Sequence, residues 1–334
     1  MKKDLFSSSG IWVKGNLHTH TKNSDGLLSP EEVISYYSSH GYDFLAITDH
    51  EKVTAIKSEK IVLLPGSEIS VGKGLLGDSY HILAINVEDN ELLQKYKNES
   101  VQTLLNFVNK EKSFAIVAHP YWSKLTHSDL LNIEGYIGVE VYNGGCDVEV
   151  AKGFSTVHWD NLLSQRINVY GFATDDAHHY SDLDSARGWI NVKVKEKSIE
   201  EILSSIKKGN FYSSSGPVIE YLSYDVNKIE VRSSPVERVD FISEGGSGLS
   251  VSLEIYNKIK RTKGKILALD KVEINHENGN ETAYVELGNS KITIRTERGD
   301  ITSVNLEGVN FKNYFRVEVT DHSNKKAWSN PIFL

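Results

Sequence analysis

Residues 11–20 read IWVKGNLHTH, an apolar run that ends in two histidines one residue apart. The run is too short for a helix, so it predicts a strand that is buried on both faces, as in a parallel sheet. Six further runs of the same kind follow along the chain, at residues 43–50, 61–68, 81–87, 113–120, 138–143 and 168–176.

Helical signals lie between several of these runs. Ser29-Pro30-Glu31-Glu32 is a capping box with proline at the first helical position, and Gly41 is suited to end that helix. Strands that alternate with helices predict an α/β barrel or a doubly wound sheet. The glycine-rich link 70–80 lacks a helical pattern and allows the fourth strand to run in reverse. Further helices are predicted over residues 98–111, 156–166 and 198–208.

The pattern changes after residues 213–217, which read SSSGP. Apolar residues now alternate with polar ones, as in Val251-Leu253-Ile255, and Asn278-Gly279 is a hairpin signal between two such runs. At 334 residues the chain exceeds the usual size of one domain. We therefore expect a first domain over residues 1–219 and a smaller antiparallel, β-sandwich-like accessory domain over residues 220–334.

The composition limits the possible partners and compartments. The single cysteine, Cys146, excludes an internal disulfide and a thiolate-rich metal site, and it fits a reducing compartment such as the cytoplasm. A formal net charge of -8 argues against a long nucleic-acid polymer as partner, because such binders present a basic surface. No stretch approaches the roughly 20 apolar residues that span a membrane, and the N-terminal residues lack the apolar run of a secretory signal.

Imidazole and carboxylate side chains stand at the ends of the predicted strands. They are His18 and His20 after the first strand, His50 after the second, Glu68 after the third, His119 after the fifth, Asp176 and His178 after the seventh, and His81 at the start of the fourth. The carboxyl ends of parallel strands are where α/β barrels collect the polar groups of an active site. A lone His-x-His has an ordinary explanation as two unrelated histidines, but the whole set together predicts a shared metal site.

These residues form a series of motifs that resembles the PHP (polymerase and histidinol phosphatase) domain. The series is His18-Thr19-His20-Thr21, Asp25, Thr48-Asp49-His50, Gly66-Ser67-Glu68, Ala118-His119-Pro120 and Asp176-Ala177-His178. The segments Tyr212–Pro217 and Ala327–Pro331 also resemble a subgroup with a C-terminal β-domain. The resemblance implies a distorted (β/α)7 barrel that holds three adjacent divalent metal ions.

The resemblance also implies how the ligands are shared among the three ions. One ion takes His18, His20, Glu68 and Asp176, a second takes Glu68, His81 and His119, and the third takes Asp25, His50 and His178. Two of these assignments stay open. The ligand could be Asp175 instead of Asp176, and His179 instead of His178. Imidazole and carboxylate ligands suit manganese, zinc or iron, and the sequence does not choose among them.

Such a site suits phosphate chemistry. Metal coordination lowers the pKa of bound water from 15.7 to about 7, so a metal-bridged hydroxide can attack phosphorus at neutral pH. We therefore expect a metal-dependent phosphoesterase that hydrolyses a small phosphorylated metabolite. A nucleotide and a sugar or amino-alcohol phosphate monoester are the substrates we consider.

Further residues can be given catalytic roles, and for His179, Asp175 and Asp49 adjacency is the only ground. Glu68 and Asp176 act through the metals, and Arg187 could hold a phosphate bidentately, although a surface ion pair explains it somewhat better. Candidates for protonating the leaving alcohol are His179, Asp175 and Asp49. Tyr121, Tyr142 and Asn143 follow strand ends and are candidates for the pocket wall.

Three other functions remain open from the sequence. A metal-dependent amidohydrolase also begins with His-x-His, but it usually needs a bridging carboxylated lysine, whereas here Glu68 supplies the bridge. A nuclease acting on oligonucleotides is disfavoured by the acidic charge. A non-catalytic metallo-scaffold is disfavoured because structural metal sites are normally closed. The oligomeric state is not determined by the sequence.

Overall fold

The computed structural model describes residues 3–4, 10–90, 95–96, 98–109, 112–180 and 183–334, which form two compact units. The first unit comprises residues 8–215, and the second comprises residues 216–334 with the short strand β1 (Lys3–Asp4). The expected domains, 1–219 and 220–334, remain predictions about where independently folding parts end. Residues 110 and 111 of the helix predicted over 98–111 lie outside the described residues.

The first unit is built on a mixed sheet, and all seven predicted strands are present in it. In spatial order the strands are β10 (Phe211–Ser214), β9 (Trp189–Val194), β2 (Ile11–Asn16), β3 (Phe44–Ile47), β4 (Val62–Val71), β5 (Tyr80–Ile85), β6 (Phe114–Val117), β7 (Tyr136–Asn143) and β8 (Tyr170–Thr174). Strand β5 runs antiparallel to both β4 and β6, which confirms the reversal after the glycine-rich link.

The sequence analysis did not predict two strands of this sheet. Strands β9 and β10 pair antiparallel with each other, and β9 pairs antiparallel with β2. The segment that forms β10 reads FYSS, so it lacks the apolar run that marks a buried strand. The side chain of Ser213 in β10 also bridges to β8, because its Oγ donates to the carbonyl of Gly171 at 2.7 Å and accepts from the amide of Ala173 at 3.0 Å.

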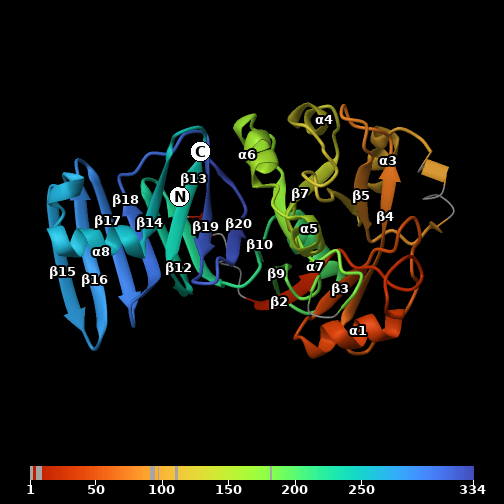
Figure 1. The fold of residues 1–334 in the computed structure, drawn as a ribbon, viewed down its shortest axis with the longest axis horizontal. Helices are drawn as coiled ribbons and strands as arrows, with labels where there is room; N and C mark the ends of the chain where they lie inside the picture. Colours follow the sequence, from red (N-terminus) through yellow and green to blue (C-terminus); the bar gives the residue numbers. More distant parts are fainter. Residues whose placement is uncertain (1–2, 5–9, 91–94, 97, 110–111, 181–182) are drawn as a thin grey trace. The chain divides into compact units, whose positions relative to one another are not determined.

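Helices lie around the outside of this sheet (Figure 1). They are α1 (Pro30–Ser39), α3 (Val101–Val108), α4 (His127–Leu131), α5 (Gly144–Val150), α6 (Thr156–Ser164) and α7 (Ile199–Lys207). The capping box at Ser29 is confirmed, since its side chain accepts from the amide of Glu32 while the Glu32 carboxylate accepts from the amide of Ser29 at 2.7 Å. The other three predicted helices are confirmed as α3, α6 and α7.

A hydrophobic core of aliphatic residues and phenylalanines fills the inside of the first unit. Phe172 and Phe211 are fully buried, and their rings stack with centroids 4.9 Å apart. Gly138 in β7 lies against this core, where a Cβ atom would stand 2.4 Å from the Phe172 ring and from the carbonyl oxygen of Tyr170. A glycine is required there, because any side chain would displace the ring or the neighbouring strand.

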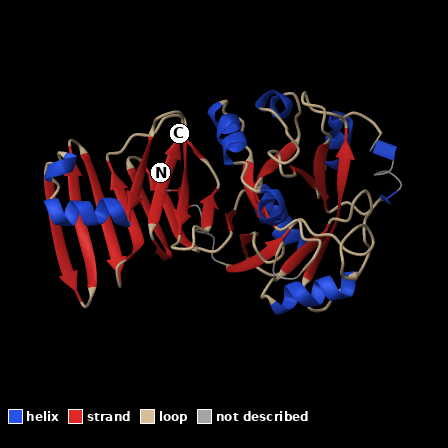
Figure 2. Ribbon diagram, viewed as in Figure 1, coloured by secondary structure: helices blue, strands red, loops and turns tan. Residues whose placement is uncertain are grey.

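The second unit consists of two antiparallel sheets (Figure 2). One has the order β1, β11 (Ile219–Asp225), β12 (Lys228–Val236), β18 (Asp300–Glu307), β17 (Ser290–Glu297), β16 (Asn280–Leu287) and β15 (Lys271–Glu277). The other contains β14 (Gly248–Ser252), β13 (Arg238–Ser243), β19 (Tyr314–Thr320), β20 (Lys326–Ser329) and, paired with β19, β21 (Ile332–Phe333). Tyr224 of β11 packs edge-on against Phe315 of β19 at 5.4 Å, so the two sheets share an apolar interior.

One strand predicted in this unit is wrong and one hairpin is confirmed. The alternation Val251-Leu253-Ile255 predicted a strand, but β14 ends at Ser252 and helix α8 (Leu253–Thr262) begins there. The Ser252 hydroxyl accepts from the amide of Ile255 at 3.2 Å, and this N-cap outweighs a three-residue alternation. Asn278 and Gly279 join β15 to β16 with φ values of 51° and 81°, the left-handed pair that a tight hairpin requires.

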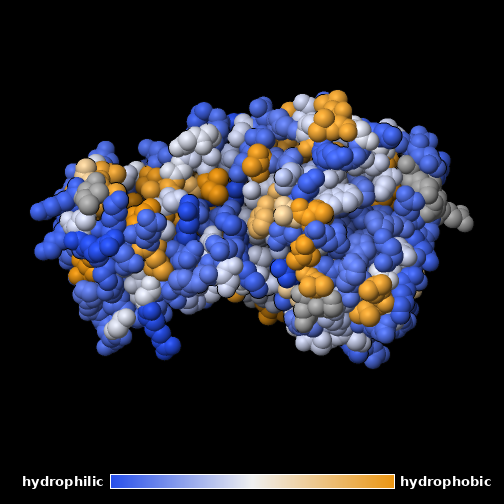
Figure 3. Space-filling model, viewed as in Figure 1, coloured by the Kyte–Doolittle hydropathy of each residue, from blue (hydrophilic) through white to orange (hydrophobic). Residues whose placement is uncertain are grey.

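On the face seen in Figure 3 hydrophilic residues predominate and the apolar ones are scattered. Scattered apolar side chains are normal for a protein surface. Within the described part of the chain, no helix is long and apolar enough to cross a bilayer.

The core of the first unit offers a test of the packing. Replacing Phe172 by alanine should lower the free energy of unfolding by about 3–5 kcal/mol, because it leaves a cavity beside Phe211 and Gly138. Urea denaturation followed by tryptophan fluorescence measures this change. Replacing Val157, which is 70% exposed on α6, should alter the stability by no more than about 0.5 kcal/mol. Equal effects at the two positions would contradict the described core.

Candidate metal centre

The backbone beyond β2 carries the first two histidines of the site. It stays paired on both sides, because the amide of His20 donates to the carbonyl of Ala177 at 3.0 Å and the amide of Thr48 donates to the carbonyl of Thr19 at 2.9 Å. Side chains alternate along an extended chain, so His18 and His20 project to the same side while Thr19 projects to the other. The sequence His-x-His therefore delivers two imidazoles to one place.

The first cluster brings together His18, His20, Glu68 and Asp176. The Oε2 atom of Glu68 lies 3.0 Å from His18 Nε2 and 3.2 Å from His20 Nε2. The Oδ1 atom of Asp176 lies 3.1 Å from each of the same two nitrogens. All four residues are buried, so four ligand atoms converge where water has little access.

The second cluster uses the other oxygen of Glu68. Its Oε1 atom lies 2.7 Å from His81 Nδ1 and 3.0 Å from His119 Nε2. His119 is held in place from behind, because its Nδ1 lies 3.0 Å from the Ser123 hydroxyl. A single carboxylate thus contacts two groups of imidazoles at once.

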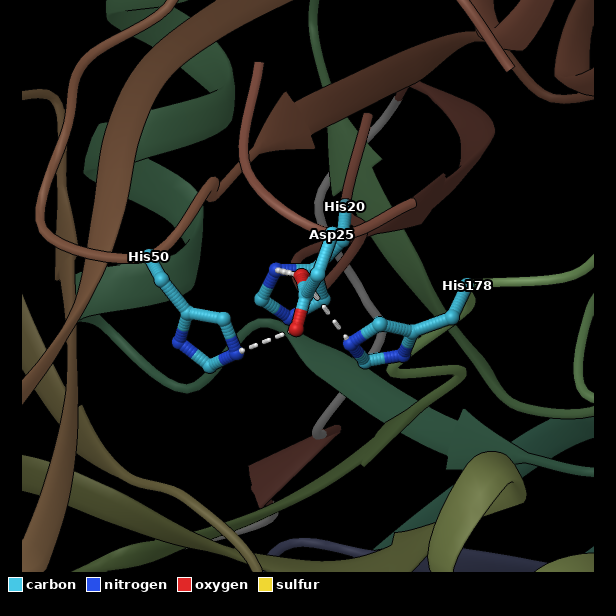
Figure 4. Close-up of side chains that lie close together, drawn as sticks. All are labelled: His20, Asp25, His50 and His178. Carbon is cyan, nitrogen blue, oxygen red and sulfur yellow. Dashed lines mark ion pairs between the residues drawn. The ribbon is translucent and has the colours of Figure 1, made fainter. Parts of the chain in front are cut away.

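The third cluster surrounds Asp25 (Figure 4). The carboxylate of Asp25 lies 3.4 Å from His50 Nε2, 3.4 Å from His178 Nε2 and 3.7 Å from His20 Nδ1. The Nδ1 atom of His20 is buried without a hydrogen-bond partner. His20 therefore faces two clusters with its two nitrogens, whereas the sequence analysis placed it in the first cluster alone.

The structure separates the two residue pairs that the sequence left interchangeable. Asp176 and His178 join the clusters, while Asp175 turns away and accepts hydrogen bonds from Asn16 Nδ2 at 2.8 Å and from the Tyr37 hydroxyl at 2.7 Å. Asp176 has a φ of 56°, and this left-handed residue redirects the chain between the two carboxylates. Burial raises the pKa of Asp175 to about 6, against the effect of the backbone amide of Gly188.

His179 takes a different position from the metal-facing histidines. Its half-exposed side chain lines the pocket above the clusters, and its Nδ1 lies 3.2 Å from Asp184 Oδ2. Asp184 is buried and also accepts from the amides of His178 and His179, each at 2.7 Å. The ring of His179 is therefore oriented by a fixed carboxylate.

The remaining expected residues lie outside the pocket. Among the described residues that line it, neither Arg187 nor Asp49 nor Asp175 is present. Arg187 lies beside Tyr142. Asp49 instead accepts hydrogen bonds from the Thr21 amide at 2.6 Å and the Ser24 hydroxyl at 2.8 Å, so it supports the loop that carries Asp25.

The sequence analysis missed Glu140, which lies directly behind the clusters. Its Oε1 contacts His18 Nδ1 and accepts from the Thr174 hydroxyl, each at 2.7 Å, and its Oε2 accepts from the His119 amide and from Asn143 Nδ2, each at 2.8 Å. A glutamate is rarely fully buried without such partners. The charge within the apolar run GVEVYN was therefore a usable signal.

Asn143 was expected only as a wall residue, yet it links Glu140 to the ligand set. Its Nδ2 also donates to Asp176 Oδ2 at 3.1 Å, and its Oδ1 accepts from the amide of Cys146 at the start of α5. The residues behind the clusters thus fix two of the four side chains in the first one, His18 and Asp176.

The charges of the cluster suit cations. Burial lowers the pKa of His20, but hydrogen bonds to Asp176 and Glu68 outweigh it and raise the pKa to about 9. Burial raises the pKa of Glu68, yet the adjacent His18 charge and the hydrogen bond with His119 hold it well below its usual range. Buried carboxylates at this spacing need positive partners, either protons on the imidazoles or metal ions among them. With His18, His119 and Glu140 as a fourth group, the nitrogen and carboxylate atoms form four overlapping groups that fit divalent metal ions.

A pocket of about 340 Å³ opens over the clusters. Besides the cluster residues it is lined by Trp122, Gly145, Cys146, Glu149 and His179, and no lysine or arginine is among its described lining residues. Any anion bound here must be neutralised by groups other than lysine and arginine.

Metal binding should release protons. Because His20 keeps its proton up to about pH 9 in the metal-free protein and a metal needs the neutral imidazole, the apparent affinity should rise with pH toward that value. Calorimetric titration with Mn²⁺ in two buffers of different protonation enthalpy measures the release at pH 7.5. Identical heats in the two buffers would contradict the clustered arrangement.

Glu140 offers a second test. Glu140→Gln should weaken metal binding by about 10- to 100-fold, because an amide cannot accept from all four donors and leaves His18 poorly oriented. A chelator competition assay measures the affinity. Glu134→Gln on the exposed surface is the matched control and should bind metal as the original chain does. Unchanged affinity in Glu140→Gln would show that Glu140 does not orient the ligands.

The fold has a counterpart among solved structures. A two-domain protein containing a predicted PHP-like metal-dependent phosphoesterase, from Bacteroides vulgatus ATCC 8482, is 16% identical, covers 97% of this chain and 95% of its own, and aligns with a TM-score of 0.51. No family model matches the chain. At this identity the likeness establishes the fold alone.

Two curated relatives match a shorter part of the chain. The 5'-3' exoribonuclease of Haemophilus influenzae is 33% identical over 85 residues, which cover 22% of this chain and 29% of that protein. The 5'-3' exoribonuclease Rnm of Salmonella typhimurium is 34% identical over 91 residues, which cover 25% and 30%. The chain thus spans less than a third of the length of these relatives. Its fold is that of the PHP-like metal-dependent phosphoesterases, as the series of histidine and carboxylate motifs indicated.

Proposed function

We propose that the chain is a metal-dependent phosphoesterase that hydrolyses the phosphate monoester of a small metabolite. The observation that carries the proposal is the set of three overlapping ligand clusters beneath a pocket without lysine or arginine. A phosphate dianion needs concentrated positive charge, and bound divalent ions would supply more of it here than the imidazoles alone.

Three divalent ions, manganese, zinc or iron, fit the three ligand sets. The sets are His18, His20, Glu68 and Asp176; Glu68, His81 and His119; and His20, Asp25, His50 and His178. When bound there, divalent ions would lower the pKa of water and so supply a nucleophile at neutral pH.

The chain's own residues orient the ligands and the leaving group. Glu140 holds the Nδ1 side of His18, and Ser123 holds that of His119, so both Nε2 atoms face the pocket side. We assign His179 as the group that gives a proton to the leaving alkoxide, because it lines the pocket and Asp184 fixes its ring. Arg187 does not line the pocket, so we assign it no contact with phosphate.

Two further expectations belong to this proposal. We describe the first unit as a distorted (β/α)7 barrel, supported by the Ser213 bridge between β8 and β10 and by the reversed β5. We also place the protein in the cytoplasm, supported by a single, buried cysteine.

A nuclease acting on oligonucleotides is the second candidate. The local identity with two 5'-3' exoribonucleases favours it. The net charge of -8 and the absence of lysine and arginine among the described pocket residues favour the small substrate. An amidohydrolase is less well supported, since no lysine lines the described pocket to form the usual bridge. A scaffold is less well supported because the pocket is open.

Glu68→Gln tests the proposal. The amide cannot bridge two ligand sets, so metal content and phosphate release should both fall to the level of the background. Elemental analysis and phosphate release over a panel of phosphorylated metabolites with Mn²⁺ measure the two effects. Glu220→Gln, an exposed glutamate of the second unit, should leave both unchanged.

Other outcomes would support the alternatives. Processive shortening of a 3'-labelled oligonucleotide, without release of phosphate from metabolites, would establish the nuclease. Turnover of amides without turnover of esters would establish the amidohydrolase. Full metal content with no turnover of any ester or amide would support the non-catalytic metallo-scaffold.

A further inference from the structure

An exposed tryptophan forms part of the pocket wall. Trp122 lies three residues after the ligand His119, lines the pocket and is 39% exposed. Its ring packs almost perpendicular to the rings of His81 and His119, with centroids 5.6 and 5.1 Å away. Single exposed aromatics are common on surfaces, but this one touches two proposed metal ligands.

The loop that carries Trp122 is held in a fixed conformation. Tight turns close it, since the amide of Ser123 donates to the carbonyl of His119 at 3.1 Å and the amide of Leu125 donates to that of Pro120 at 3.0 Å. The amide of Tyr121 donates to the Ser155 hydroxyl at 3.1 Å, which ties the loop to the start of α6. The indole is therefore presented on a rigid support and needs little ordering when a ligand binds.

The residue before Trp122 is also an exposed aromatic. Tyr121 is 45% exposed, and Lys152 Nζ lies 5.7 Å from the centre of its ring. By contrast, the polar lining outside the metal clusters reduces to Glu149, Cys146 and His179. A sugar phosphate would find few partners for its hydroxyl groups here, whereas a planar ring would find an aromatic face beside the phosphate site.

We propose that the substrate is a nucleoside monophosphate whose base stacks on Trp122. This inference rests on the proposed phosphoesterase function and names its substrate class. Base stacking on an aromatic side chain contributes about 1–3 kcal/mol and tolerates any base, because every base has a π-face. A single phosphate fits better than a polymer, because the pocket holds no lysine or arginine among its described residues to follow a phosphate backbone.

The test compares two substrates that differ only by the base. Adenosine 5'-monophosphate and ribose 5-phosphate share the sugar and the phosphate, so any disturbance of His81 or His119 affects both equally. In Trp122→Leu the ratio of kcat/KM for the nucleotide to that for the sugar phosphate should fall by about 5- to 150-fold, mainly through KM. Trp122→Phe should restore most of the ratio. Tyr284→Leu, an exposed aromatic of the second unit, should leave it unchanged.

The outcomes separate this inference from the function on which it rests. If the chain hydrolyses both substrates and the ratio is the same in Trp122→Leu, base stacking is overturned while the phosphoesterase stands. If it hydrolyses neither, the proposed function fails, and equilibrium dialysis of adenosine 5'-monophosphate with Mn²⁺ still decides the stacking. Equal binding by Trp122→Leu and Tyr284→Leu would then overturn it. Faster turnover of a short oligonucleotide than of the mononucleotide would overturn the choice of a single nucleotide.

Discussion

The structure of the candidate site depends on one buried carboxylate. Glu68 is 1% exposed, and its two oxygens lie within 3.2 Å of five imidazoles. They belong to His18, His20, His50, His81 and His119. Such a group cannot stay charged in an apolar interior without positive partners at close range. Either the imidazoles keep their protons, as the raised pKa of His20 in the metal-free protein indicates, or divalent ions take the place of those protons. The chemistry that we propose requires the second arrangement, in which divalent ions take the place of the protons.

A single reversed strand, β5, brings one of these five imidazoles to Glu68. Most of the candidate ligands follow the carboxyl ends of strands, and Glu68 lies in the last part of β4, but His81 lies near the start of β5. Because β5 runs antiparallel to β4, its first residues pair with the last residues of β4, and His81 stands opposite Ser70. A parallel β5 would have placed His81 at the far edge of the sheet, away from Glu68. The glycine-rich link thus replaces a crossover helix so that a fifth imidazole reaches the shared carboxylate.

Layers of different chemistry surround this centre. Behind it, Glu140 and Asn143 fix the ligands through short hydrogen bonds, and Asp49 supports the loop of Asp25. Above it, His179 with Asp184 provides an oriented imidazole at the pocket wall, and Trp122 provides an exposed aromatic face. In the proposed function, metal ions in the clusters would hold a phosphate and a nucleophile, but they would distinguish poorly between one phosphoester and another. Selectivity must come from the residues above, which is why the tryptophan matters for the choice of substrate.

The amino-acid sequence by itself determined the ligand types, their order along the strands, the cap of α1 and the hairpin at Asn278-Gly279, because each depends on neighbouring residues. Local patterns were insufficient elsewhere: the alternation over Val251-Leu253-Ile255 formed the end of β14 and the start of α8, and the FYSS of β10 carried no apolar run. Only the tertiary structure decided that His20 faces two clusters, that Asp176 and not Asp175 points inward, and that Glu140 joins His18 to His119. The physical reason is that these contacts join strands far apart in the chain, and their geometry follows from the register and twist of the whole sheet rather than from local sequence.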